Sequence, residues 1–234
     1  MTYRLLYWPG IPGRGEFVRL PLEAAGVAYE DCGVERGGDA VVSYLEAQKD
    51  HPAFAVPLIE TDEGERIAQV ANILAYLGPL HGFAPGDARE RRFLNQVQLT
   101  IADMVEEAHN THHPVSSGAY YEDQKPEALR AANDFRETRI PKFLGYFESI
   151  AAANPSGWLV GDAWSYGDTS LRHLLQGLTF AFPKRMAKVA GDYPAIHALS
   201  DRLGQLERLG AYEASDRHQP WADGIFRHYP ELDG

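Results

Sequence analysis

The chain has 234 residues, 44% of them hydrophobic, with 22 Lys and Arg against 33 Asp and Glu, a formal net charge of −11. This size suggests one large or two small globular domains with a real core. The negative charge argues against nucleic acid or an anionic membrane as the main partner. A lone cysteine, Cys32, excludes an internal disulfide and a Cys-x-x-Cys redox pair. With no signal peptide evident and no apolar run of 18 residues, we expect a cytoplasmic protein.

The first 78 residues alternate strand-like runs with helical stretches, which predicts an α/β domain. Strands are expected at 3–7, 27–34, 56–60 and around Arg66. The turn Thr61-Asp62-Glu63-Gly64 is typical of a hairpin between the last two strands. Five of the nine residues from Gly78 to Gly86 are Gly or Pro, a composition that ends a helix and marks a boundary. We therefore expect one domain at 1–78, a linker at 79–88 and a second domain at 89–234.

The second domain has helical periodicity and no strand pattern of any length. A helix after Asp87 is expected to bury the face formed by Phe93, Val97, Ile101, Met104, Val105 and Ala108. Another helix is expected from Pro126 to Ala152, bent at Pro141. The run Ser165-Tyr166-Gly167-Asp168 is typical of a capping box that begins a helix, a structural feature. From Glu213 the sequence is rich in aromatic residues without helical periodicity, which indicates an ordered tail.

Tyr7 closes the first expected strand and is followed at once by a turn-rich segment that ends at Gly15. A phenol at this junction faces the N-terminus of the next helix, whose positive potential favours a bound anion. No Ser, Thr or Cys lies between Tyr7 and Tyr29, so a side-chain hydroxyl acting at this turn belongs to Tyr7. From position alone, the other interpretation is an ordinary tyrosine that packs its ring at a strand end.

Several motifs, in their order and spacing, resemble the glutathione transferase family, and specifically its mu/pi/sigma-like branch with a catalytic tyrosine. They are Leu6-Tyr7-Trp8, Gly13-Arg14-Gly15-Glu16 with Arg19, Ala25-Gly26-Val27, Tyr29-Glu30-Asp31, Val56-Pro57-Leu58, residues 67–78, residues 158–162 and residues 165–168. The resemblance implies a thioredoxin-like N-terminal domain and an all-helical C-terminal domain. It also implies a homodimer that transfers the glutathione thiolate to small hydrophobic electrophiles, with glutathione as co-substrate and no other cofactor.

The resemblance assigns catalysis to Tyr7. The thiol of glutathione has a pKa near that of cysteine, about 8.5, and is mostly protonated at neutral pH. A phenol with a pKa of about 10 stays protonated and can donate its O–H to sulfur. Lowering the thiol pKa by ~2 takes about 2.7 kcal/mol, roughly what one charge-assisted hydrogen bond supplies.

The resemblance also implies a glutathione site. Arg14 would brace the turn and add positive potential, and Val56 would pair its backbone with the cysteinyl part of glutathione beside a cis Pro57. Gln69, at a helix start, would receive the γ-glutamyl carboxylate. Val70 departs from the family, which has Ser or Thr there; the missing hydrogen bond is worth about 1 kcal/mol, although the Val70 N–H remains available.

More distant residues complete the expected site. Lys49 would meet the glycyl carboxylate, and Asp103 would reach the glutathione bound to the neighbouring subunit. The pocket for the second substrate is expected to include Trp8, His109, His113 and Tyr120.

Four possible metal ligands lie near the same helix end at three- and four-residue spacing: Glu106, His109, His112 and His113. Neighbouring His112 and His113 point about 100° apart and no second ligand cluster exists, so we expect no metal.

Other functions remain open. A non-catalytic glutathione-binding or ligand-binding protein of the same fold is favoured by Val70 and opposed by Tyr7. A peroxidase or isomerase could use the same thiolate. A glutathione-dependent thiol reductase would want a cysteine near Gly10, and there is none.

Overall fold

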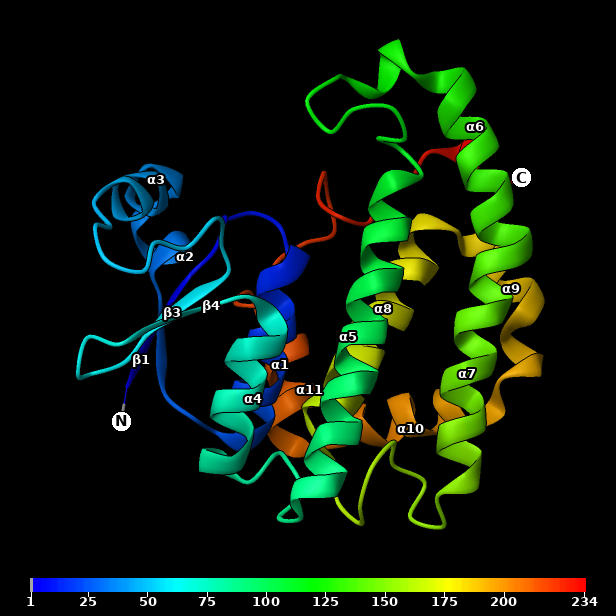
Figure 1. Cartoon of the computed structure of the whole chain (residues 1–234). Coiled ribbons are helices and arrows are strands. Elements are labelled where there is room, and N and C mark those ends of the chain that lie inside the picture. The colour runs from blue at the N-terminus through cyan, green and yellow to red at the C-terminus, as the bar shows by residue number, and fades with distance from the viewer. Residues whose placement is uncertain (1) are drawn as a thin grey trace.

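Four short strands form a mixed sheet at one end of the computed structural model, which describes residues 2–234 (Figure 1). The strands are β1 (Tyr3–Leu6), β2 (Tyr29–Asp31), β3 (Leu58–Glu60) and β4 (Arg66–Ala68). The sheet order is β2-β1-β3-β4, with β1 parallel to β2 and antiparallel to β3, and β3 antiparallel to β4. The hairpin prediction is confirmed, because the Gly64 N–H donates to the Thr61 carbonyl at 2.9 Å between β3 and β4.

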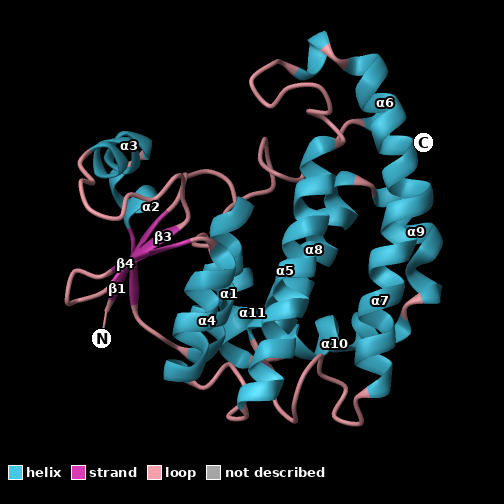
Figure 2. Cartoon of the chain, in the orientation of Figure 1, coloured by secondary structure: helices cyan, strands magenta, loops and turns pink. Residues whose placement is uncertain are grey.

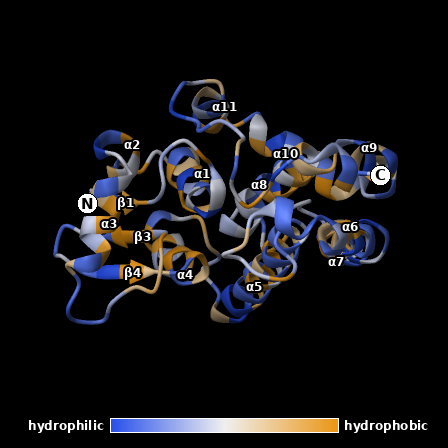
Figure 3. Cartoon of the chain, turned by 90° about the horizontal axis from the view of Figure 1, so that it is seen from above, coloured by the Kyte–Doolittle hydropathy of each residue, from blue (hydrophilic) through white to orange (hydrophobic). Residues whose placement is uncertain are grey.

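Side chains alternate across the sheet and are buried on both faces. Leu5 pairs with Ile59, and both join the large core shared with the helices. Their neighbours Leu6 and Leu58 point to the other face, into a smaller cluster with Val41. This period of two is the strand pattern that the sequence predicts. Figure 3 shows β1 and β3 as hydrophobic strands enclosed by helices.

Four helices accompany the strands: α1 (Glu16–Ala25), α2 (Cys32–Arg36), α3 (Gly38–Glu46) and α4 (Val70–His81). The strand expected at 27–34 is shorter than predicted because α2 begins at Cys32, where the Asp31 side chain accepts from the Val34 N–H. The α4 helix continues three residues past the expected end at Gly78, with Pro79 inside it. The division into domains at 78–88 stays a prediction.

The remaining chain is helical, as predicted (Figure 2). Its helices are α5 (Ala88–Asn110), α6 (Lys125–Asp134), α7 (Ile140–Ala153), α8 (Tyr166–Ala181), α9 (Pro183–Val189), α10 (Pro194–Gly204) and α11 (Glu207–Glu213). On α5 the predicted buried face is correct except at Phe93, which is 38% exposed, while Leu94 takes the buried position. The single helix expected at 126–152 is divided by a π-helical turn, Phe135–Arg139, which lies just before Pro141. Proline has no N–H to continue the regular ladder.

One core joins the sheet region to the helical region. α1 packs against α8 and α11, and α4 packs against α5. The predicted capping box is confirmed at the start of α8, where Asp168 accepts from the Ser165 N–H at 2.8 Å. The aromatic tail is ordered, since the Trp221 ring stacks on His173 and Tyr229 stacks on Tyr121. Among the described residues, no helix is long and apolar enough to cross a membrane.

Candidate functional site

Tyr7 follows β1 directly and turns its ring into the glycine-rich loop before α1. Its side chain is only 4% exposed. The Arg14 N–H donates to the Tyr7 hydroxyl oxygen at 2.7 Å. Burial raises the pKa of Tyr7, although the Arg14 N–H and the positive charges of Arg14 and Arg19 oppose this. The phenol is therefore protonated at neutral pH, with its oxygen already engaged as an acceptor by the backbone.

Two glycines let the ring lie this close to the loop. A Cβ on Gly13 would come within 2.3 Å of the Tyr7 hydroxyl oxygen, and a Cβ on Gly15 within 2.6 Å of ring carbons. Gly13 also has a φ of +46°, a conformation that L side chains rarely adopt. The Gly-Arg-Gly sequence thus sets where the phenol sits.

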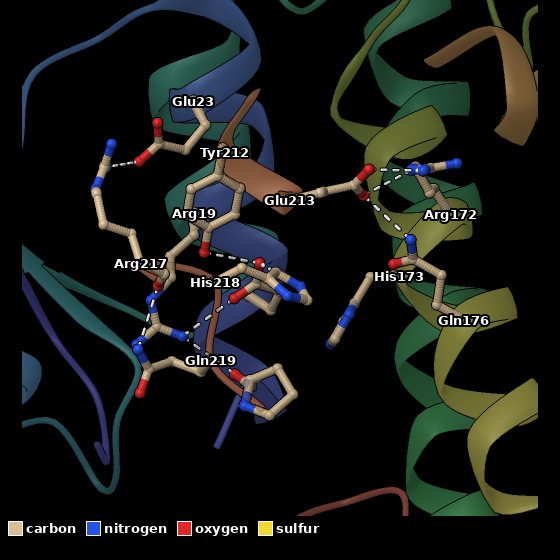
Figure 4. A network of polar contacts seen from close by, with 12 residues as sticks. Arg19, Glu23, Arg172, His173, Gln176, Tyr212, Glu213, Arg217, His218 and Gln219 are labelled. Carbon is tan, nitrogen blue, oxygen red and sulfur yellow. Dashed lines mark hydrogen bonds and ion pairs between the residues drawn. The ribbon is translucent and has the colours of Figure 1, made fainter. Parts of the chain in front are cut away.

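A buried ionic network holds the far side of this loop (Figure 4). The fully buried Arg19 donates to Asp31 at 2.6 Å, to Glu16 at 3.3 Å and to the Pro12 carbonyl at 3.3 Å. Its guanidinium carbon lies 5.8 Å from the centre of the Tyr7 ring. Tyr212 from α11 donates to Glu16 at 2.9 Å. Arg19 is paired with two carboxylates, which offsets part of the cost of burying its charge, although its Nη2 has no partner among the described residues. The network ties the loop to both regions.

A cleft of about 960 Å³ opens beside this loop, between the sheet region and α5. Its walls are residues 54–57 before β3, residues 69–72 at the start of α4, the α5 face from Asn95 to His109, and Arg14 with Phe17. Of the predicted glutathione site, Arg14, Val56, Pro57, Gln69 and Val70 all line it. These residues come from three separate segments of the first 70 residues.

The start of α4 is built to receive an anion. Gln69 has a φ of 73°, which is unusual for a residue other than glycine, and such outliers cluster at functional sites. No side chain caps this helix, so the first N–H groups, beginning at Val70, lack a side-chain partner among the described residues. They face the cleft together with the Gln69 amide. Free N–H groups and the helix dipole favour a carboxylate here.

Val56 is the second backbone feature of the cleft. The peptide bond between Val56 and Pro57 is cis, which confirms the prediction. Neither the N–H nor the carbonyl of Val56 has a hydrogen-bond partner among the described residues. Both groups are available to pair with an extended peptide-like ligand.

Arg14 spans the cleft mouth. Its guanidinium donates to Glu106 on α5 at 2.8 Å, and both side chains are well exposed. One turn further along α5, His109 also lines the cleft. Burial lowers the pKa of His109, so its imidazole is neutral at pH 7. Sequence reasoning weighed Glu106 only as a metal ligand and missed this contact.

The other predicted site residues do not line the cleft. Tyr7 does not line it either, but its hydroxyl group is hydrogen-bonded to Arg14, which does. Trp8 and Lys49 are exposed and have no polar partner among the described residues, and Asp103 is exposed on α5. His113 lies 3.5 Å from the Gln124 amide, and Tyr120 is 78% exposed. Apart from Asp103 on α5, these residues lie in loops, whose geometry the local sequence does not encode.

Sequence reasoning also missed apolar and amide residues of the cleft. Phe17, Phe54 and Leu99 contribute apolar surface, and Gln98 contributes a buried amide. Phe17 is on α1, directly after the glycine-rich loop, so the helical period of α1 could have identified it. No group of three or more His, Cys, Asp or Glu residues in the described chain is arranged to hold a metal ion.

Comparisons with known proteins agree with this geometry. The sequence profile of a family described as "Glutathione S-transferase, C-terminal domain" matches residues 109–216. The chain is 27% identical to glutathione S-transferase A1 of Bos taurus, over 83% of this chain and 80% of that protein. It is 27% identical to glutathione S-transferase P 1 of Xenopus laevis, over 92% of both.

Solved structures share the fold. A Pi-class glutathione S-transferase of Onchocerca volvulus superposes with a TM-score of 0.71 at 20% identity, over 91% of this chain and 92% of that one. The small mixed sheet followed by helices is thus the thioredoxin-like domain and helical domain that the sequence predicts. Together, the matched profile, the relatives aligned over most of their length and the shared fold show that this chain resembles the glutathione S-transferase family.

Proposed function

We propose that this protein conjugates the glutathione thiolate to small hydrophobic electrophiles and that Tyr7 stabilises the thiolate. The observation that carries the proposal is the 2.7 Å hydrogen bond from the Arg14 N–H to the Tyr7 oxygen. The backbone satisfies the oxygen as an acceptor, and the phenol proton has no acceptor among the described residues. That proton is free to be donated to sulfur.

The energy required is within reach of this one contact. Shifting a thiol pKa from about 8.5 to about 6.5 takes about 2.7 kcal/mol. Hydrogen bonds to a charged acceptor contribute about 1.5–3 kcal/mol. The buried ring loses little entropy when it donates, and the nearby Arg14 and Arg19 add positive potential.

The rest of glutathione fits the cleft in an order that the backbone supports. The γ-glutamyl carboxylate lies at the start of α4 against Gln69 and the Val70 N–H. The cysteinyl part pairs with the free backbone groups of Val56. Arg14 adds charge at the mouth. Lys49 for the glycyl carboxylate remains a prediction that would require its loop to close over the ligand.

The second substrate lies on the α5 side of the cleft, which His109 and the apolar side chains of Phe17 and Val105 line. Mixed polar and aromatic walls favour flat electrophiles. Trp8, His113 and Tyr120 stay in the proposal as outer residues of this pocket, to be tested by substrate profiles of alanine variants.

A homodimer is part of the proposal. Phe54 is 98% exposed at the cleft edge, and Leu99 on the α5 wall is half exposed. Exposed large apolar side chains at one edge favour a protein surface as their cover. Asp103 is exposed on the same helix, which suits its proposed contact with glutathione of the partner subunit. We also propose a cytoplasmic location.

The function is tested by initial rates with glutathione and an aryl halide, beside calorimetric titration of glutathione. The proposal expects saturable turnover and a 1:1 binding isotherm per chain. Binding without turnover on any electrophile would instead support the non-catalytic alternative, and turnover on hydroperoxides or isomerisable ketones alone would support the peroxidase or isomerase. No binding at all would contradict the glutathione site.

A further inference from the structure

His173 is a buried polar residue that the proposed mechanism does not use. It lies in the middle of α8 and has no exposed surface. Three aromatic rings enclose the imidazole: Phe17 edge-on at 4.6 Å, Trp221 stacked at 5.2 Å, and Phe226 edge-on at 5.9 Å between ring centres. From this cage, its Nε2 reaches the Gly13 carbonyl oxygen at 2.9 Å, across the boundary between the helical region and the catalytic loop.

The contact defines the protonation state of the ring. A carbonyl oxygen can only accept, so Nε2 carries the hydrogen. The buried Nδ1 has no partner among the described residues. Burial lowers the pKa of His173 to about 3; the hydrogen bond to Gly13 opposes this, and the neighbouring His218 and Arg19 side chains act in the same direction as burial. His173 is therefore a neutral donor near neutral pH.

The acceptor of this hydrogen bond belongs to the peptide group that binds Tyr7. The Gly13 carbonyl and the Arg14 N–H are the two ends of one trans peptide, and they point in opposite directions. His173 donates to one end at 2.9 Å, and the other end donates to the Tyr7 oxygen at 2.7 Å. Hydrogen bonds in such a chain polarise one another, by perhaps 10–30% per bond.

We propose that His173 is a positioning residue for Tyr7, acting through the Gly13–Arg14 peptide. Its donation holds the peptide plane, strengthens the Arg14 N–H as a donor, and so makes the phenol a better donor to the thiolate. This inference rests on the proposed role of Tyr7. Figure 4 shows His173 projecting from α8 beside the Arg19 network, so the helical region and the ionic network support the same loop from two sides.

The aromatic cage makes the C-terminal tail part of this support. Trp221 and Phe226 come from the tail, and a Cβ on Gly177 of α8 would meet the Phe226 ring at 2.3 Å. The Gly10 N–H donates to Gln219 of the tail at 2.9 Å. The tail thus covers His173 and contacts the catalytic loop at the same time.

The test measures the thiol pKa of bound glutathione, from the ultraviolet absorbance of its thiolate, in His173→Leu and His173→Gln. We expect His173→Leu to raise this pKa by about 0.2–0.6, which is 10–30% of a shift of about 2. Glutamine retains an N–H at a similar reach, so His173→Gln should restore most of the lost effect. The Kd of glutathione should change less than kcat, since the peptide acts on sulfur stabilisation.

His112→Leu is the matched control for burial. His112 is also buried and neutral, and its Nε2 contacts the Ile225 carbonyl at 3.0 Å on the tail, away from Gly13. The His112→Leu variant should be less stable, but the thiol pKa of bound glutathione should not rise. Equal rises in His112→Leu and His173→Leu, or no rise in a folded His173→Leu, would overturn the inference.

A double-mutant cycle with Tyr7→Phe separates this inference from the proposed function. If His173 acts through Tyr7, adding His173→Leu to Tyr7→Phe should raise the thiol pKa no further. A rise that adds to the effect of Tyr7→Phe would contradict action through Tyr7. If Tyr7→Phe leaves the thiol pKa unchanged, the role of Tyr7 fails first and His173 has nothing to act through.

Discussion

Substitution of Gly13 by alanine should reduce the catalytic rate far more than it reduces the stability of the fold. The new Cβ would lie 2.3 Å from the Tyr7 hydroxyl oxygen and 2.8–2.9 Å from two ring carbons. Ordinary contacts between such atoms begin near about 3.5 Å, so the phenol must move by roughly 1 Å. A misplacement of about that size can cost about 100-fold in rate. The positive φ of +46° adds about 1–2 kcal/mol of backbone strain.

Gly10→Ala is the matched control in the same loop. Gly10 has a φ of +79°, so alanine there carries comparable strain, but nothing lies within 4 Å of its Cβ. Gly10→Ala should lose about 1–2 kcal/mol in urea unfolding, and Gly13→Ala should lose more because the clash with Tyr7 adds to the strain. Only Gly13→Ala should lose about 100-fold in kcat/KM with glutathione and an aryl halide, while Gly10→Ala stays within about threefold. Equal activity losses in the two variants, or full activity in Gly13→Ala, would refute the packing argument for Tyr7.

Three further outcomes follow from single side chains. Val70→Ser should tighten glutathione binding about fivefold by calorimetry, since a new hydroxyl contact is worth about 1 kcal/mol. Unchanged affinity would contradict the binding of the γ-glutamyl carboxylate at the start of α4. Gly33→Ala should lower the free energy of unfolding by about 3 kcal/mol or more, because its Cβ would lie 1.8 Å from the Tyr7 carbonyl oxygen. An unchanged urea midpoint would show that α2 can shift away from Tyr7. Asp168→Ala should also lower the free energy of unfolding by about 3 kcal/mol or more, since the carboxylate accepts from the N–H groups of Leu159 and Ser165 at 2.8 Å. The kcat/KM of the folded variant should stay unchanged, and a selective loss of activity would contradict a purely structural role.

Local chemistry explains which parts of the site were predictable. Tyr7 lies between a strand and a glycine-rich turn, so local backbone rules predict its place. The cis peptide at Pro57 and the roles of Arg14 and Gln69 were instead expected from the family resemblance. The strand and helix types followed equally from hydrophobic periodicity. Errors appeared at boundaries such as Cys32, where a polar cap ends the strand early.

Long-range packing explains what the sequence did not predict. The contact between His173 and Gly13 joins residues 160 positions apart, and no local pattern encodes it. Lys49 and Tyr120 sit in segments without periodicity, so their orientation depends on loop packing. Phe93 looked apolar enough for the core, but the neighbouring Leu94 occupies the buried side of α5.

The most direct test of the central claim compares the natural protein with Tyr7→Phe at pH 7, by initial rate and by glutathione titration together. A thiol pKa of about 6.5 rising to about 8.5 would reduce the thiolate fraction from roughly 76% to roughly 3%, so kcat should fall about 25-fold. The linked loss of affinity should be no more than about fourfold. Unchanged turnover in a variant that binds glutathione normally would contradict thiolate stabilisation by Tyr7.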